Sequence, residues 1–406
     1  MAETFTVTTG RGGEDVLAKE LRRMGLQRVV DERGAVRFMG PLRDGLRACL
    51  WSRVGSRVLL RLARFEAMSA DALYEGVAAI PWQDHVAPDG TIRVEFVGTS
   101  RAIRDERFGA VKTKDAVVDV IRDRAGRRPD VAREHPDVAI HVHLRNNVAT
   151  VSLDLSGASL HLRTPGRRTG VAPLKETLAA TMLLLADWPR RAREGQPFVD
   201  PMCGSGTLVL EAAGIAHDVA PGLARSHWGF TRWLGRDDAA WRELVDEAEE
   251  RRRAGCSRRS TLLGTDRDAR SIGLARENAK RLDLPGVLFE SRALEQLRPH
   301  GDRAGLLVTN PPFGERLTAI DAAAVYRSLG DALRQQMLGW DAFVLAPLGP
   351  LAKSLGLRTR ARHVLFNGPI ECRLLEVGIS TTRPQGERRG RREADASSVK
   401  SFQDQK

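Results

Sequence analysis

Hydrophobic and polar positions alternate in a regular way from Pro197 onward, where short apolar runs are separated by amphipathic helical patterns. The apolar runs have the length of buried strands, which predicts a doubly wound parallel sheet with helices between its strands. An antiparallel pair of strands near residues 363–366 and 372–377 is expected to close this sheet. The predicted fold class of this part is therefore α/β, of the Rossmann-like kind. The expected parallel strands are residues 198–200, 261–265, 287–290, 305–309 and 342–346.

Residues 1–165 have a different pattern, in which strands and helices mix in two smaller α+β units. The first unit is expected to contain strands at 4–8 and 36–39 and helices at 15–24 and 42–51. The second is expected to contain helices at 70–79 and 113–125 and strands at 91–97, 138–144 and 148–153. Proline, glycines and a lack of periodicity at residues 164–170 then indicate a domain boundary.

A helix that opens at residues 173–176 is expected to run to about Trp188. Residues 217–259 are expected to form an insertion. The reason is that Asp200 and Asp266, which end or follow the first two expected strands of the sheet, are farther apart in the sequence than a simple β-α-β unit requires. Its three tryptophans can touch RNA bases or anchor the insertion to the core, and we favour anchoring for Trp228, Trp233 and Trp241. Residues 246–259 are expected to be a solvated, charged helix end.

These patterns predict four segments. They are an N-terminal domain at 1–57, a second domain at 58–165, the sheet domain at 166–380, and a tail at 381–406. The tail is polar and has little to bury, so we expect it to be disordered.

The net charge of the chain says more about its partners than its length does. The chain has 406 residues, 42% of them hydrophobic, and a formal charge of +12. Positive charge favours a polyanionic partner, because neutralising phosphates releases counterions and drives association. An arginine-rich proteome background is the alternative explanation.

Several classes of protein are disfavoured. The four cysteines, Cys49, Cys203, Cys256 and Cys372, are far apart in the sequence, so neither a disulfide framework nor a metal site is expected. The start of the chain is acidic where a signal peptide would be basic, and the apolar stretch at 178–186 is too short to span a bilayer. We therefore expect a cytoplasmic protein without a membrane partner.

The most informative motif is Asn310-Pro311-Pro312-Phe313, which directly follows the expected strand at 305–309. An exocyclic amine becomes nucleophilic when its N–H groups are drawn toward fixed acceptors, and the Asn310 side-chain oxygen and the Pro311 carbonyl can act as such acceptors. Pro312 removes a donor and stiffens the turn. Phe313 can stack on an extruded base, or it can simply pack inward. The motif therefore favours methyl transfer to a base amine.

A second motif, residues 198–207, has the pattern of a strand, a glycine-rich turn and a helix. A dinucleotide fold would need a third glycine at the position of Val209, so S-adenosylmethionine, which has no phosphate, is the better candidate ligand. We predict that Asp200 accepts a hydrogen bond from its ammonium group, directly or through water. Asp266, at the end of the second expected strand, is predicted to bind the ribose, although such an acid is often only a helix cap.

Basic residues cluster around the expected start of the helix at 113–125, near the positive end of its dipole. We interpret this cluster as a phosphate-binding face. An ordinary solvated surface paired with Asp105, Glu106 and Asp115 is the alternative. Its members are Arg101, Arg104, Arg107, Lys112 and Lys114.

Several motifs together resemble the THUMP-domain guanine-N2 RNA methyltransferases of bacteria, over about residues 1–380. The nearest likeness is the half that modifies 23S ribosomal RNA in longer bifunctional enzymes. The shared motifs are residues 50–53, 109–116, 153–157, 161–163, 172–177, 200–207, 228–230 and 310–317.

The resemblance implies an N-terminal ferredoxin-like domain, a THUMP domain that binds structured RNA, and a class I methyltransferase domain that uses S-adenosylmethionine. The implied catalytic residues are Asn310, Pro311, Pro312 and Phe313. The implied cofactor-binding residues are Asp200, Cys203, Gly204, Gly206, Thr207, Asp266 and Glu176. Arg163 joins the basic cluster among the predicted RNA-binding residues.

Three departures from the family pattern matter. Phe313 stands where the family usually has tyrosine, so a hydroxyl contact is lost. Ala293 stands where an acid would bind the adenine amine, and Glu290, Glu295 or a backbone carbonyl could compensate. The second methyltransferase half of the bifunctional relatives is absent, so we expect one modification.

The expected reaction is in-line displacement at the sulfonium methyl by guanine N2, without a metal or a covalent enzyme intermediate. Positioning is expected to supply most of the rate. The alternatives are transfer RNA as substrate, an adenine-N6 DNA methyltransferase, and a non-catalytic RNA-binding assembly factor. The sequence itself does not decide between ribosomal and transfer RNA.

Overall fold

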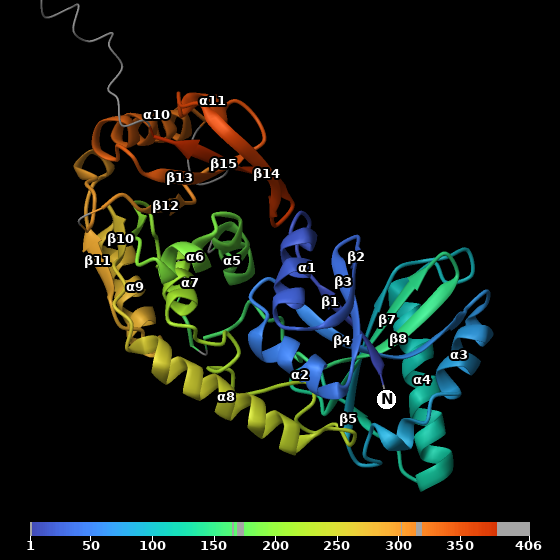
Figure 1. The fold of residues 1–406 in the computed structure, drawn as a ribbon. Helices are drawn as coiled ribbons and strands as arrows, with labels where there is room; N and C mark the ends of the chain where they lie inside the picture. Colours follow the sequence, from blue (N-terminus) through green and yellow to red (C-terminus); the bar gives the residue numbers. More distant parts are fainter. Residues whose placement is uncertain (1, 165, 169–173, 302, 314–318, 380–406) are drawn as a thin grey trace, which may run out of the picture.

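The computed structural model describes residues 2–164, 166–168, 174–301, 303–313 and 319–379. It consists of two lobes, each built on one sheet, and helix α8 crosses along the base from one lobe to the other (Figure 1). The expected tail at 381–406 lies outside the described residues, as do residues 172–173 and 314–317 of the family motifs.

The N-terminal lobe contains an eight-stranded sheet in the order β2-β3-β1-β4-β8-β7-β5-β6. Strand β4 pairs with both β1 and β8, so the sheet runs without a break across the boundary predicted at residues 57 and 58. The strands are β1 (Glu3–Thr8), β2 (Gln27–Glu32), β3 (Ala35–Gly40), β4 (Arg57–Glu66), β5 (Thr91–Val97), β6 (Asp130–Val131), β7 (Val138–Arg145) and β8 (Val148–Asp154). The helices are α1 (Glu14–Arg23), α2 (Leu42–Trp51), α3 (Ala70–Ala78), the 3-10 turn η1 (Trp82–Asp84) and α4 (Glu106–Ala125).

Helix α4 begins seven residues before the predicted start at residue 113. Asp105 caps it by accepting a hydrogen bond from the Arg107 N–H at 2.9 Å. Gly109 lies inside the helix. A Cβ at this position would be only 2.7 Å from the Phe96 ring, so the close packing of α4 on β5 requires a glycine. Arg107, Lys112 and Lys114 therefore lie on the helix itself and not in a loop before it.

The C-terminal lobe contains a seven-stranded sheet in the order β11-β10-β9-β12-β13-β15-β14. Its first five strands are parallel, and β15 and β14 are antiparallel, which confirms the predicted closing pair. The strands are β9 (Phe198–Asp200), β10 (Leu262–Asp266), β11 (Val287–Ser291), β12 (Leu306–Thr309), β13 (Asp341–Pro347), β14 (Thr359–Asn367) and β15 (Ile370–Gly378). The helices are α5 (Glu176–Leu185), α6 (Trp188–Arg193), α7 (Thr207–Ala216), α8 (Asp238–Cys256), α9 (Ala269–Leu282), η2 (Leu294–Gln296), α10 (Ala319–Gln336) and α11 (Leu351–Ser354).

The long helix expected after residue 173 is broken into α5 and α6. Helix α5 ends at Leu185, and Asp187 adopts a left-handed conformation with φ of 54° before α6 begins. Trp188, the first residue of α6, is buried, and its indole N–H donates to the Ala212 carbonyl of α7 at 2.8 Å. The break therefore lets a bulky side chain turn into the core beneath α7.

The insertion anchors the C-terminal lobe to the N-terminal lobe. Trp228, Trp233 and Leu244 are buried in the same hydrophobic cluster as β1, α2 and β8, so the tryptophans anchor the insertion as expected. Residues 246–256 belong to a regular helix, α8, that packs against α2 and is not merely a solvated end. Arg47 of α2 holds Glu247 of α8 with two hydrogen bonds of 3.2 Å.

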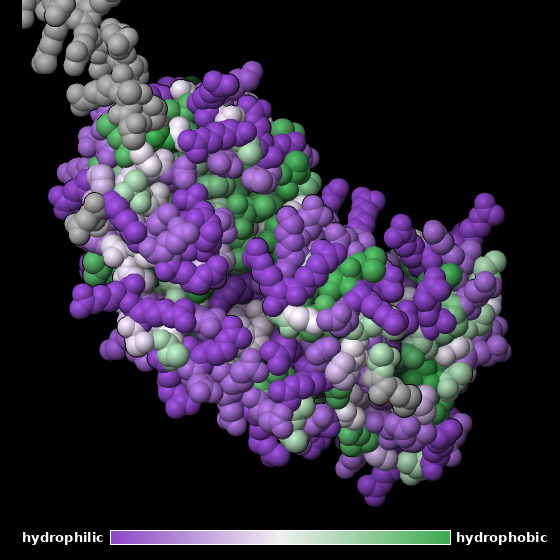
Figure 2. All heavy atoms as spheres, in the orientation of Figure 1, coloured by the Kyte–Doolittle hydropathy of each residue, from purple (hydrophilic) through white to green (hydrophobic). Residues whose placement is uncertain are grey.

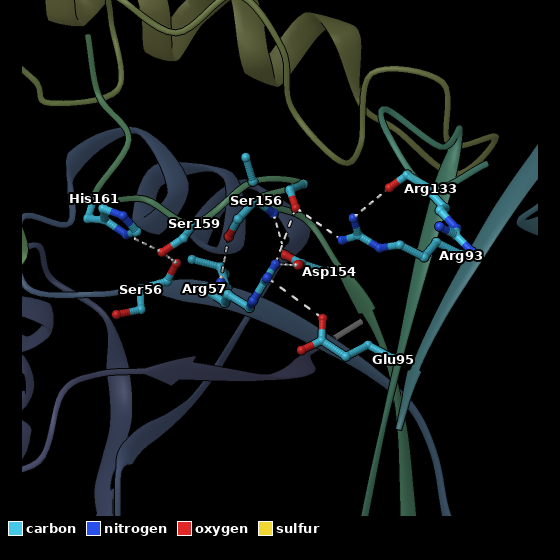
Figure 3. Close-up of polar contacts among 12 residues, drawn as sticks. Ser56, Arg57, Arg93, Glu95, Arg133, Asp154, Ser156, Ser159 and His161 are labelled. Atoms are coloured by element: carbon cyan, nitrogen blue, oxygen red, sulfur yellow. Dashed lines mark hydrogen bonds and ion pairs between the residues drawn. The ribbon is translucent and has the colours of Figure 1, made fainter. Parts of the chain in front are cut away.

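An ion pair between a half-buried arginine and a buried aspartate fixes the point where the chain leaves the N-terminal lobe. Figure 3 shows Arg57 of β4 and Asp154 of β8 pointing toward each other, with Glu95 of β5 beside them. Asp154 also accepts the Ser156 N–H at 2.9 Å, and the Ser156 hydroxyl accepts the Val58 N–H at 2.7 Å. The direction of the connecting segment after β8 is therefore set by hydrogen bonds inside the lobe.

Candidate active site

The carboxyl ends of β9, β10, β11 and β12 surround a cavity of about 640 Å³, which we call the strand-end cavity. Ligands of open α/β sheets bind at this edge, where the loops diverge. The cavity brings together Asp200, the glycine turn, Asp266 and Asn310, which are far apart in the sequence. Its position follows from the parallel order of the strands, because that order places all their carboxyl ends on one edge.

Asp200 ends β9 and is 1% exposed. Its carboxylate accepts hydrogen bonds from the Thr309 hydroxyl at 2.8 Å and from the Met202 N–H at 3.1 Å. Burial raises the pKa of Asp200 to about 7, and the charge of Asp266 acts in the same direction, although the two hydrogen bonds oppose the rise. Asp200 therefore changes charge near neutral pH, and a cation beside it would favour the ionised form.

The glycine turn is held by Asp266. This carboxylate accepts the Gly204 N–H at 2.9 Å and the Asp268 N–H at 3.0 Å. Gly204 and Gly206 both have positive φ, of 52° and 87°, which glycine adopts without strain. Nothing lies within 4 Å of a Cβ built on Gly204, so the turn leaves open space for a ligand, and Gly206 caps α7 behind it.

Cys203 also lines the cavity and is buried. Burial raises the pKa of its thiol well above the ordinary value, and the charges of Asp200 and Asp266 add to this effect. The Cys203 side chain is therefore a neutral thiol at the wall of the cavity.

Asn310 follows β12 and lines the same cavity as Asp200. Its side-chain oxygen is buried and accepts no hydrogen bond from any residue that the structure describes. A buried acceptor without a donor costs about 1–3 kcal/mol, so a ligand group that donates a hydrogen bond to this oxygen would bind favourably. An amine N–H is one chemical group that would satisfy it.

The other three residues of the tetrapeptide are placed differently. Pro312 lines the strand-end cavity, and Pro311 is buried. Phe313 is half-buried and packs against the hydrophobic cluster formed by α5, α7 and the sheet. In this structure Phe313 is not part of the cavity wall, and its stacking on a base stays a prediction.

The segment that joins the lobes lies against α7. Arg163 forms an ion pair with Glu211 and donates to the Arg53 carbonyl, and it is only 4% exposed. These contacts turn the guanidinium away from the surface of the described chain, and RNA binding by Arg163 stays a prediction. The sequence does not show that a carboxylate of α7 lies beneath this side chain.

Arg167 makes a similar contact four residues later. Its guanidinium pairs with Glu176 of α5 and donates to the Thr207 hydroxyl at the start of α7. Thr207 lines the strand-end cavity, but Glu176 lies behind it, at 9% exposure. Arg167 is a residue that sequence reasoning missed. No sequence pattern signals its role, because the carboxylate and the hydroxyl that it contacts belong to two other helices, α5 and α7.

Arg292 lines the cavity beside Ala293, where the family pattern has an acid. One nitrogen of its guanidinium contacts Glu290, and another is buried without an acceptor among the described residues. Glu290 is therefore engaged with Arg292, whereas Glu295 lines the cavity and is exposed.

The predicted RNA-binding cluster is only partly neutralised. Lys112 pairs with Asp71 at 3.2 Å and Lys114 with Asp115 at 2.7 Å. Arg101, Arg104 and Arg107 are exposed and form no ion pair within the described part of the chain. RNA binding by these arginines stays a prediction.

The described residues contain no cluster of three or more potential metal ligands, and none of their helices is long and apolar enough to cross a membrane.

Comparison with known families agrees with this geometry. Residues 164–376 match the model of the RMKL-like methyltransferase domain. The chain belongs to this family. Residues 67–154 match the THUMP domain, and residues 4–59 match the RlmL ferredoxin-like domain. The predicted family and fold class are both confirmed.

One curated relative is the ribosomal RNA large subunit methyltransferase K/L of Syntrophotalea carbinolica. It is 45% identical over 384 residues, which make up 93% of this chain and 54% of the relative. The chain thus spans about half the length of the curated relatives it matches.

Solved structures share nearly the whole fold. SMU.472 complexed with SAH has a TM-score of 0.82 at 29% identity and covers 95% of this chain and 99% of its own. A predicted N6-adenine-specific DNA methylase from Listeria monocytogenes has a TM-score of 0.81 at 29% identity and covers 93% and 97%. The two neighbours differ in the activities attached to their names, so the fold alone does not specify the substrate.

Proposed function

We propose that this member of the RMKL-like methyltransferase family uses S-adenosylmethionine to methylate guanine N2 in structured RNA, most simply in 23S ribosomal RNA. The chemical part of the proposal rests on the Asn310 oxygen in the strand-end cavity, which has no hydrogen-bond donor among the described residues. The name of the ribosomal RNA relatives supports the choice of substrate. A ribosomal substrate would place the reaction in the cytoplasm.

The residues of the strand-end cavity fit this cofactor. Asp200 offers a buried carboxylate for an ammonium group, Asp266 offers a second carboxylate for ribose hydroxyls, and the open side of Gly204 leaves room for the ligand. Thr207 and Cys203 complete the wall near the turn. The SAH bound to the structural neighbour SMU.472 gives independent support. When bound, S-adenosylmethionine supplies an electrophilic methyl group.

Asn310 is the residue proposed to act on the nucleophile. Its oxygen would accept an N–H of the guanine amine, and the Pro311 carbonyl would accept the other. As positive charge develops on this nitrogen, fixed acceptors stabilise it without reorganising. The charged product nitrogen is acidic, so its proton needs no strong base.

Positioning supplies the rest of the rate. The target base must leave its stack to reach the strand-end cavity. This unstacking costs a few kcal/mol, so a loop or bulge of the RNA is favoured as substrate over a continuous helix. The basic residues of α4 are proposed to hold the phosphates of the surrounding RNA.

We also propose the domain division 1–57, 58–165 and 166–380, with a tail at 381–406. The three matched family models, at residues 4–59, 67–154 and 164–376, support the first three segments.

The test uses the purified full chain with S-adenosylmethionine that carries a tritiated methyl group. Unmodified 23S ribosomal RNA, transfer RNA and duplex DNA serve as separate substrates, and each product is digested to nucleosides. We expect the label in N2-methylguanosine from ribosomal RNA. Label in N2-methylguanosine from transfer RNA alone would change the substrate. Label in N6-methyladenine from DNA, the activity in the name of the Listeria neighbour, would overturn the proposal.

A further inference from the structure

A second cavity, of about 590 Å³, lies between the lobes, and we call it the basic cavity. It is bounded by α1 and α2 of the N-terminal lobe, by α6 and the end of α7 in the C-terminal lobe, and by α8 below (Figure 1). Figure 2 shows a hollow between the lobes on this face, surrounded mainly by hydrophilic residues. The basic cavity is separate from the strand-end cavity and shares no lining residue with it.

The lining of the basic cavity is strongly positive, with seven arginines against three carboxylates. Some of these arginines already have partners. Arg251 holds Asp218 with two hydrogen bonds of 2.8 and 2.9 Å, and Arg47 holds Glu247. These pairs fix the walls of the cavity but leave its net charge positive.

Arg23, Arg193 and Arg258 are different. They are exposed at the edge of the cavity, one from α1, one from α6 and one after α8. Their side chains form no hydrogen bond or ion pair with any residue in the described part of the chain. Uncompensated guanidinium groups that converge from three elements are suited to bind an anion, and the fork of each matches phosphate oxygens.

Trp51 gives a second, independent indication. It lines the basic cavity at 7% exposure, with the Arg251 guanidinium 3.7 Å from its ring centroid. Its indole N–H is buried and has no acceptor among the described residues. A buried donor without an acceptor is as costly as the orphaned Asn310 oxygen, and an oxygen of an anionic ligand would satisfy it.

Helix α7 connects the two cavities. It begins at the glycine turn of the strand-end cavity, and Ala216 at its far end lines the basic cavity. Ten residues of helix measure about 15 Å, which is less than the width of an RNA duplex and only a few phosphodiester steps. One RNA molecule is therefore large enough to reach both cavities.

We propose that the basic cavity binds phosphodiester groups of the RNA substrate, at a distance from the target base. This inference rests on the proposed function, because it takes the polyanion to be the RNA that is methylated. Its phosphate contacts would hold the substrate in register without reading sequence. They would also make binding weaken steeply with salt, because each neutralised phosphate releases a counterion.

The test compares RNA binding by the full chain and by a triple variant, Arg23→Gln with Arg193→Gln and Arg258→Gln. The probe is an unmodified 23S ribosomal RNA transcript, and its Kd is measured over a range of KCl concentrations. The loss of three phosphate contacts should make the plot of log association constant against log KCl concentration less steep, by roughly two to three in slope. It should also raise Kd about tenfold or more at physiological salt. The affinity for S-adenosylmethionine, measured by calorimetry, should not change.

A matched control removes the same charge elsewhere. Arg33, Arg64 and Arg327 are exposed and lie outside the basic cavity, so the triple Gln variant at these positions should lose much less affinity. Equal losses in the two variants would overturn the inference, because only net charge would then matter. Thermal stabilisation by inorganic phosphate, abolished in the cavity variant while RNA affinity is unchanged, would also overturn it in favour of a small-anion site.

The failure of this inference can be distinguished from failure of the proposed function. If the wild-type chain transfers no methyl group to RNA, the proposed function fails whatever the variants do. If methyl transfer is normal and the cavity variant binds RNA as the wild type does, only the inference about the basic cavity fails.

Discussion

The two cavities at opposite ends of α7 are built in contrasting ways. In the strand-end cavity, the polar atoms belong to buried side chains and backbone whose positions are fixed by hydrogen bonds, as Asp200 and Asp266 illustrate. In the basic cavity, the free charges are exposed arginines on long, flexible side chains. The first arrangement suits a reaction that depends on precise placement, whereas the second suits binding of a polymer by charge.

The largest effect should come from Asn310→Ala, which removes the orphaned acceptor. Turnover should fall by roughly 10²–10³, with little change in the affinity for S-adenosylmethionine, if the oxygen acts mainly in the transition state. Single-turnover methyl transfer and calorimetry measure the two quantities. Asn367→Ala, at the end of β14 and outside the strand-end cavity, is the matched control and should leave both unchanged. Normal turnover in the Asn310 variant would remove this residue from the mechanism.

The next effect concerns the charge of Asp200, whose pKa is raised to about 7 by burial. The ammonium group of the cofactor binds the ionised carboxylate, so affinity should fall as pH drops below about 7, by up to roughly tenfold per unit. Affinity should be retained above this value until the ammonium group itself loses its proton, near pH 8. Calorimetry between pH 6 and pH 8 tests this dependence.

Asp200→Asn is the control for that pH profile. The variant should bind S-adenosylmethionine roughly ten- to a hundredfold more weakly at pH 8, because a hydrogen bond to a charged group is lost. Its affinity should also be nearly independent of pH below 7. An unchanged pH slope in this variant would show that another group titrates.

A smaller effect is expected from Arg167, which acts through Glu176 and Thr207 and not on the ligand directly. Arg167→Met should raise the KM for S-adenosylmethionine several-fold with little loss of kcat, since it loosens the cavity wall and leaves Asn310 in place. Arg167→Lys should restore part of the affinity, because the charge is kept. A fall in kcat alone would contradict a positioning role.

The smallest effect on the reaction should come from the contact between the lobes, where a substitution changes stability and not the site. Gly12 has φ of 85°, and a Cβ there would lie 2.1 Å from the Val364 carbonyl oxygen of β14. Gly25 has nearly the same φ, of 83°, with nothing within 4 Å, so it serves as the matched control. Gly25→Ala should cost about 1–2 kcal/mol from backbone strain. Gly12→Ala should cost a further 1–3 kcal/mol or so, because two backbones must separate.

Urea unfolding of the two glycine variants measures that difference. Equal destabilisation would mean that the loop before α1 can move away from β14 at no cost, and that this contact does not help to hold the lobes together.

Much of the fold was predictable because local patterns report it. The period of the apolar residues located the strands of the C-terminal sheet, and the antiparallel closing pair was found in the same way. The start of α4 was predicted seven residues too late, because the position of Gly109 inside the helix depends on its close packing on Phe96, which the sequence does not show. The continuous eight-stranded sheet was also missed, because β4 pairs with strands from both sides of the expected boundary.

The candidate site also has residues that the sequence identified and contacts that only the tertiary structure decided. Asp200, Asp266, the glycine turn and Asn310 were identifiable because each ends a strand or directly follows one, and parallel strands bring such ends to one edge. Tertiary packing decided which charged and polar side chains meet. It turned Arg163 inward onto Glu211, joined Thr309 to Asp200 and packed Phe313 on the core. It also gathered, at the edge of the basic cavity, three arginines that have no partner among the described residues. The physical reason is that periodicity records which face of an element is buried, whereas the partner of a charge depends on which elements are packed together in space.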